Sequence, residues 1–264
     1  QSADDNAFAN TIATDPGVKK KNVANMLSAL QQRGDSTVAA FKALYNFNDG
    51  YFAAAEAEGK KPMVLLGTYV NLEQSFEDYA KLTMTYYGDD YAYYYKGHPN
   101  TPTGLWPSKQ TQLDTLGITD IDSSVAAELI LFFNPEVALS GYGSSTYNSA
   151  SSDAGCGVFN MTKAAALSPS STVDYSIMDW FASSISSSSD TAIQALCPKG
   201  DTCYLVEFSD MIRKSADYDI AVFSGNTSTL TYYKKLADGT YRLIRTKTNG
   251  STLMTSAHVS GTGW

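Results

Sequence analysis

The sequence predicts an α/β protein built around an open, Rossmann-like sheet. Short apolar or aromatic runs, such as MVLLG at residues 63–67 and YAYYYK at residues 91–96, are bounded by turn-forming residues, which is typical of buried strands. Amphipathic segments lie between these runs and predict helices. Strands and helices that alternate with short connections favour a parallel sheet wound in the right-handed sense. Strands are expected over residues 63–67, 91–96, 118–121 and 137–139, and helices over residues 72–86, 108–116 and 123–133.

Two segments of different character flank this core. Residues 1–60 are expected to form a helical lead-in, because helical periodicity runs to about residue 58 and the GKKP sequence then breaks it. Residues 61–264 are expected to form one Rossmann-like domain, in which the residues after about 150 are a β-rich C-terminal extension. In that extension we expect a helix over residues 174–185, strands over residues 204–208 and 220–223, and a hairpin of residues 229–235 and 241–247.

Length and charge exclude several classes of protein. A chain of 264 residues buries a hydrophobic core without needing metal or disulfide staples. The formal net charge is −8, which argues against nucleic-acid partners and against docking on anionic lipid. No apolar run approaches the 18 residues that a membrane-spanning helix needs, so no membrane span is expected.

The cysteines do not indicate a metal site. The 3 Cys lack paired CxxC spacing and the chain has only 2 His, so no metal ligands are assigned. Cys197 and Cys203 bracket a short polar loop and form either a local disulfide or two ordinary buried thiols, while Cys156 is left over. Frequent Ser, Thr, Tyr and Asn with few Lys and Arg are common in exported proteins, so an exported or cell-surface location is favoured over a cytoplasmic one.

Polar residues follow the expected strands where an open α/β sheet binds ligands, beyond the carboxyl ends of its strands. Hydroxyls at a helix start and a histidine suit a phosphate, because a helix N-terminus offers free N–H groups and His gains charge as a leaving phosphate departs. A carboxylate on a neighbouring helix suits ribose hydroxyls. These features predict a nucleotide-binding domain, and the candidate residues are Gly67, Thr68, Lys96, Gly97, His98, Glu128, Ser144 and Ser145.

Each of these signals also has a purely structural interpretation. Gly97-His98-Pro99 after a strand is more often a turn than a site, and a Ser pair at a helix start is usually an N-cap. A single Glu on a helix is usually solvated. The order of the candidates at successive strand ends is what favours a binding site.

Several stretches resemble motifs of the bacterial sialyltransferases of glycosyltransferase family 80. YYKGHP at residues 94–99 resembles the family's His-Pro motif, and GSSTYNS at residues 143–149 resembles its Ser-Ser motif. AEL at residues 127–129 is similar to its Phe-Glu-Val-Leu segment, and LLGT at residues 65–68 is similar to the opening of its C-terminal Rossmann-like domain. The resemblance covers roughly residues 40–150.

The resemblance implies inverting transfer of sialic acid from CMP-sialic acid to a glycan acceptor on a GT-B fold, without a metal or other cofactor. It implies that His98 holds the CMP phosphate and assists its departure, that Ser144 and Ser145 bind the same phosphate, and that Glu128 holds the ribose. Lys96 and Gly97 are then expected near the base.

One part of the family's machinery has no match. The acceptor-activating Asp of the family lies in an Asp-Asp-Gly motif of an N-terminal domain, and the residues before Gly67 are too few for that domain. NDG at residues 48–50 imitates the motif but corresponds to the linker helix, so Asp49 is not assigned as the base. We therefore expect a missing N-terminal domain and no transfer by this chain alone.

Two functions follow from the sequence. The first is the CMP-sialic-acid-binding half of a sialyltransferase-like enzyme. The alternative is a secreted or cell-surface binding module that keeps the scaffold and has lost transfer activity, because fold does not fix function.

Overall fold

The computed structural model describes residues 23–67, 76–99, 107–135, 137–141, 144, 146, 158–160 and 178–248. Within the described residues, three helices precede the first strand. They are α2 (Val23–Gln31), α3 (Asp35–Leu44) and α4 (Ala53–Ala57). No residue of α3 is buried, although the Phe41 ring lies 5.9 Å from that of Phe132.

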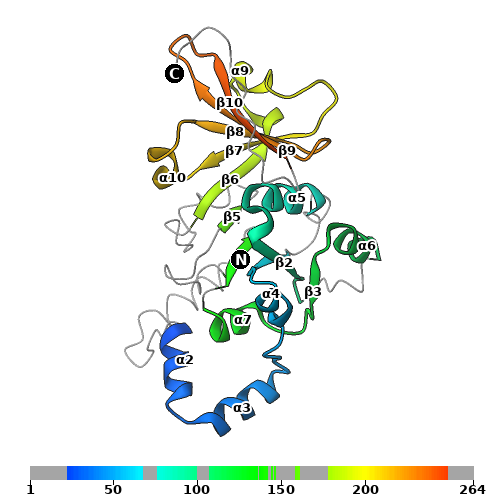
Figure 1. The fold of residues 1–264 in the computed structure, drawn as a ribbon, viewed down its shortest axis with the longest axis vertical. Helices are drawn as coiled ribbons and strands as arrows, with labels where there is room; N and C mark the ends of the chain where they lie inside the picture. The colour runs from blue at the N-terminus through cyan, green and yellow to red at the C-terminus, as the bar shows by residue number, and fades with distance from the viewer. Residues whose placement is uncertain are drawn as a thin grey trace, which may run out of the picture.

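A four-stranded parallel sheet follows, in the order β3-β2-β1-β4 (Figure 1). Its first two strands pair along their whole length, from Lys61 opposite Tyr91 to Leu66 opposite Lys96. This order places β1 in the interior of the sheet. The sequence of strands runs outward from β1 to β2 and β3 on one side and then returns to β4 on the other side, as in Rossmann-like folds. The α/β class and the expected strands are confirmed. The strands are β1 (Lys61–Leu66), β2 (Tyr91–Lys96), β3 (Thr119–Ile121) and β4 (Ala138–Gly141).

Helices cover both faces of this sheet, because its strands are apolar on both sides. Val64 and Tyr94 face α4 and α7 (Ala127–Phe133), where the rings of Phe52 and Tyr94 meet edge to face at 4.9 Å. On the other face, the side chains of β1 and β2 pack against α5 (Phe76–Tyr87). The short helix η2 (Gly88–Asp90) follows α5, and α6 (Pro107–Leu116) connects β2 to β3.

The β-rich extension forms a six-stranded sheet in the order β10-β9-β8-β7-β6-β5. Its neighbours are antiparallel except β5 and β6, which run parallel. The expected hairpin is confirmed as β9 and β10. The strands are β5 (Val158–Asn160), β6 (Met178–Ser184), β7 (Cys203–Phe208), β8 (Ile220–Ser224), β9 (Thr229–Lys235) and β10 (Tyr241–Thr248).

The helix expected over residues 174–185 is wrong for the described part of that range. Met178–Ser184 is strand β6, in which Trp180 and Ala182 are fully buried and Phe181 between them is not. This alternation is the period of a strand, and pairing with β7 fixes it. The local sequence alone does not decide between the helical and the strand period, because the partner strand β7 lies 20 to 28 residues later in the chain.

Helix α5 lies between the two sheets (Figure 1). Its Phe76, Tyr79 and Leu82 share one core with Trp180 of β6 and Phe223 of β8. The Tyr204 hydroxyl of β7 donates to Asp78 Oδ2 of α5 at 2.9 Å, and Lys247 Nζ of β10 donates to the Tyr86 carbonyl near the end of the helix. The extension is therefore packed onto the α/β core through this helix.

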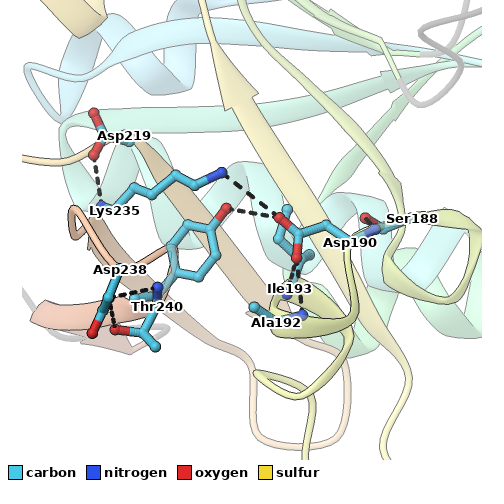
Figure 2. A network of polar contacts seen from close by, with 9 residues as sticks. Ser188, Asp190, Ala192, Ile193, Asp219, Lys235, Asp238 and Thr240 are labelled. Carbon is cyan, nitrogen blue, oxygen red and sulfur yellow. Dashed lines mark hydrogen bonds and ion pairs between the residues drawn. The ribbon is translucent and has the colours of Figure 1, made fainter.

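The other face of the antiparallel sheet is covered by the segment that includes η6 (Ile185–Ser187) and α9 (Thr191–Gln194). Asp190 caps α9 by accepting from the Ala192 and Ile193 N–H groups, and it also lies 3.9 Å from Lys235 Nζ (Figure 2). A disulfide joins Cys197 to Cys203 at the end of this segment. A short helix, α10 (Asp210–Lys214), connects β7 to β8. Among the described helices, none has the length and apolar character needed to cross a bilayer.

Candidate functional site

The carboxyl ends of the parallel strands meet at one edge of the sheet. Leu66, the last residue of β1, is paired with Lys96 of β2 on one side and with Gly141 of β4 on the other. The crossover from β1 to β2 includes α5 on one face of the sheet, and the crossover from β3 to β4 includes α7 on the other face. The strand order reverses between β1 and β4, which makes this position the topological switch point. In open α/β sheets, ligands bind in the crevice at such a point.

Glycines bring the backbone close together at this edge. A Cβ on Gly67 would lie 2.5 Å from the Tyr95 hydroxyl oxygen and 3.2 Å from the Gly97 Cα. A Cβ on Gly141, whose φ is +149°, would lie 2.6 Å from the Leu66 carbonyl oxygen. Other parts of the protein fill the space beside both glycines, so the three strand ends can pack this closely only because these positions lack a side chain.

Lys96 is almost fully buried at the end of β2, with an exposed fraction of 2%. Its Nζ donates to the Gly97 carbonyl at 2.6 Å and to the Ser123 carbonyl at 3.0 Å, so it joins the turn after β2 to the segment before α7. Burial lowers the pKa of Lys96 to about 8, and three nearby carboxylates, which include Glu128, partly offset this effect. Because its ammonium is bound to two backbone carbonyls, Lys96 holds the turn after β2 and the segment before α7 together at this edge.

Glu128 and Ser144 are joined through a residue that the sequence analysis did not single out. Thr146 is buried and donates its hydroxyl to Glu128 Oε1 at 3.0 Å, while its N–H donates to Ser144 Oγ at 3.3 Å. Glu128 is in the first turn of α7, and Ser144 follows β4. Thr146 therefore links the Glu128 carboxylate to the Ser144 hydroxyl, and Glu128 also lies close enough to the Lys96 ammonium to raise its pKa.

The other candidates are placed less completely. Gly97 is buried and lies against Gly67, whose N–H donates to the Lys96 carbonyl at 2.8 Å. His98 comes next in the chain and is half-buried. Thr68 and Ser145 lie outside the described residues.

Lys109 is a further cation that the sequence analysis missed. It is in the first turn of α6, which follows β2 and so starts at the carboxyl edge, and it is 4% exposed. Its Nζ lies 3.7 Å from the centroid of the Phe76 ring and 5.5 Å from that of Tyr95. A lysine in a first helical turn opposes the helix dipole, which is a signal that sequence reasoning can use. Within the described residues, Lys96 and Lys109 are the charged side chains that are buried.

Metal ligands do not gather in the described residues, which hold no group of three or more His, Cys, Asp or Glu side chains suited to an ion. The residues at the carboxyl edge are instead hydroxyls, lysines, backbone groups and the carboxylates near Lys96. This set matches the donors and acceptors that bind a phosphate and a sugar ring.

The comparisons with known proteins find likeness only among solved structures, and this likeness is distant. No protein-family profile matches the chain, and no curated protein matches it by sequence. Among solved structures, a sialyltransferase GT-B domain from Photobacterium damselae is 14% identical, with a TM-score of 0.39. The alignment covers 62% of this chain and 44% of that domain, so the chain spans less than half of its length. A likeness this distant does not assign a function.

The buried Lys96 predicts a pH dependence of stability. Folding lowers the pKa of Lys96 from 10.5 to about 8. Between pH 8 and pH 10.5, the lysine is therefore more fully protonated in the unfolded chain than in the folded one. Stability relative to Lys96→Met should therefore rise as the pH increases from about 8 to 10.5, by on the order of 3 kcal/mol. Urea unfolding of both proteins across this range measures the difference.

The matched control is Lys199→Met, which removes an exposed lysine. Its stability difference from the wild type should stay level over the same pH range. If the Lys96→Met difference is equally level, the lysine titrates normally and its burial has been misjudged.

Proposed function

We propose that this chain binds CMP-sialic acid at the carboxyl edge of its parallel sheet, as the donor-binding part of a sialyltransferase-like inverting glycosyltransferase. The observation that carries the proposal is the convergence of three segments at the switch point. The end of β2 meets the segment before α7 through the Lys96–Ser123 bond, and α7 meets the segment after β4 through Glu128 and Thr146. These are the segments that contain the motif-like residues.

The chemistry of each group fits one part of a nucleotide donor. Glu128 uses one oxygen to accept from Thr146, and a carboxylate has further acceptor capacity for the two ribose hydroxyls. The Ser144 hydroxyl and His98 are proposed to bind the phosphate. A proton on His98 would then stabilise the charge that develops as CMP departs.

Electrostatics favour an anion at this edge in spite of the overall charge of −8. Burying an ammonium costs free energy, so two buried lysines at one edge of a sheet are unusual in an acidic protein. Lys96 lies on the α7 side of the sheet and Lys109 lies on the α5 side. Their positive potential would offset the desolvation of a bound phosphate.

The second candidate function is a secreted or cell-surface module that binds a nucleotide sugar or glycan without transferring it. The disulfide between Cys197 and Cys203 favours a location outside the cytoplasm, as this candidate requires, because disulfides persist mainly in oxidising compartments. The two candidates differ in turnover and share the binding site.

CMP binding tests the proposal directly. His98→Ala should weaken CMP binding by about 1.5–3 kcal/mol, the usual value of a hydrogen bond to a charged group. Isothermal titration of both proteins with CMP measures this, and His258→Ala, which changes the chain's other histidine, serves as the control. An absence of CMP binding, or equal affinities for the wild type and His98→Ala, would remove the basis of the assignment.

Transfer tests the catalytic limit of residues 1–264. The groups proposed above act on the leaving CMP. A base that activates the acceptor hydroxyl typically raises the rate about 10²–10⁴-fold, and none of the described residues is assigned that role. We expect slow hydrolysis of CMP-sialic acid at most, with no sialylated product on a lactose acceptor. The assay follows free sialic acid and sialyl-lactose separately. Multiple-turnover sialyl-lactose formation would contradict this expectation and would make Asp49, Asp89 and Asp90 the first carboxylates to mutate.

A further inference from the structure

A cavity of about 370 Å³ lies at the opposite, amino edge of the parallel sheet. It forms where β3 is shorter than its neighbour: β1 pairs with β2 from Tyr91 onward, whereas β3 pairs with β2 only from Tyr94 onward. The side of β2 that faces β3 is therefore left without a strand over its first three residues. The volume falls within the range of about 300–1,000 Å³ that small-ligand sites occupy.

Small residues keep this space open. Ala54 and Ala55 of α4, Ala92 of β2 and Gly117 after α6 all line the cavity. A Cβ placed on Gly117 would meet no atom within 4 Å. Larger side chains at these positions would fill the gap left by the short strand, so the cavity follows from the sequence at the four positions.

One wall of the cavity is aromatic and fixed in position. The rings of Tyr91 and Tyr93 both line it and lie 6.5 Å apart. The Tyr93 hydroxyl donates to the Gly88 carbonyl at 2.7 Å, and the Tyr91 ring packs edge to face on Tyr87 at 5.4 Å. These contacts hold the rings in place before any ligand arrives, which lowers the entropy cost of binding.

The rim of the cavity carries charges of both signs. Lys60 Nζ lies 2.9 Å from Glu58 Oε2, and Asp89 is a second carboxylate on the rim. A ligand cation would meet the Lys60 ammonium, and a ligand anion would meet the two carboxylates. A neutral hydroxyl both donates and accepts, so it can bind to the carboxylates and to the ammonium at the same time.

We propose that this cavity is a binding site for a neutral saccharide, with one sugar ring packed on Tyr91 and its hydroxyls bound by Glu58, Asp89 and Lys60. The apolar C–H face of a sugar ring suits an aromatic wall, and its hydroxyls suit a rim of mixed charge. The site is separate from the carboxyl edge and does not depend on the function proposed for that edge.

Saturation-transfer NMR on the 264-residue chain tests the proposal with glucose, galactose, N-acetylglucosamine and lactose as probes. At least one probe should bind, and Ala54→Leu, which fills the cavity, should weaken it by roughly ten-fold or more. Ala53→Leu is the matched control, because Ala53 is exposed on the same helix and does not line the cavity. Glu58→Gln should also weaken binding, whereas Glu56→Gln, next to the cavity on the same segment, should not.

Three results would overturn the proposal: no binding by any of the four probes, equal binding by Ala54→Leu and wild type, or displacement of the sugar by tetramethylammonium or acetate. A circular-dichroism spectrum and thermal unfolding curve of Ala54→Leu that match the wild type show that the variant is folded. The two sites are separated by the wild-type chain: sugar binding without CMP binding would count against the carboxyl-edge proposal and leave this one intact.

Discussion

The burial of α5 between two sheets is the constraint on which the rest of the structure depends. Most helices of an α/β protein bury one face, whereas α5 contacts the parallel sheet on one side and the antiparallel sheet on the other. Polar bonds hold it on both sides: Thr83 Oγ1 lies 3.2 Å from Ser140 Oγ of β4, and Asp78 accepts from Tyr204 of β7. Without the antiparallel sheet, the Tyr86 ring would lose its contacts with the rings of Trp180 and Phe208, which lie 5.6 Å and 5.7 Å away, so the extension is part of the core.

This constraint also positions the candidate site. Helix α5 begins at Phe76, next to the carboxyl edge, and the Lys109 ammonium makes a cation–π contact with the Phe76 ring. On the opposite face, the carbonyls that hold Lys96 fix the turn that precedes His98. The edge is therefore defined by buried contacts on both faces of the sheet, which gives a ligand a site whose polar groups are already oriented.

The sequence was sufficient where structure depends on local pattern and insufficient where it depends on distant partners. The MVLLG and YAYYYK runs are apolar on both faces, so the strands around them could be predicted directly. Met178–Ser184 was misassigned because its alternation becomes clear only when β7 lies beside it. At the site, Glu128 and Ser144 could be named from motifs, but the Thr146 link between them and the cation–π contact of Lys109 arise from tertiary packing.

Nucleotide binding at the carboxyl edge of the parallel sheet can be tested by amide chemical-shift mapping during a CMP titration. We expect the largest shifts at the amides of Gly67, Gly97 and Thr146. We expect no shift at Gly117 and Thr119, which lie at the amino edge. Shifts confined to the amino edge, or no shifts at saturating CMP, would contradict nucleotide binding at the carboxyl edge.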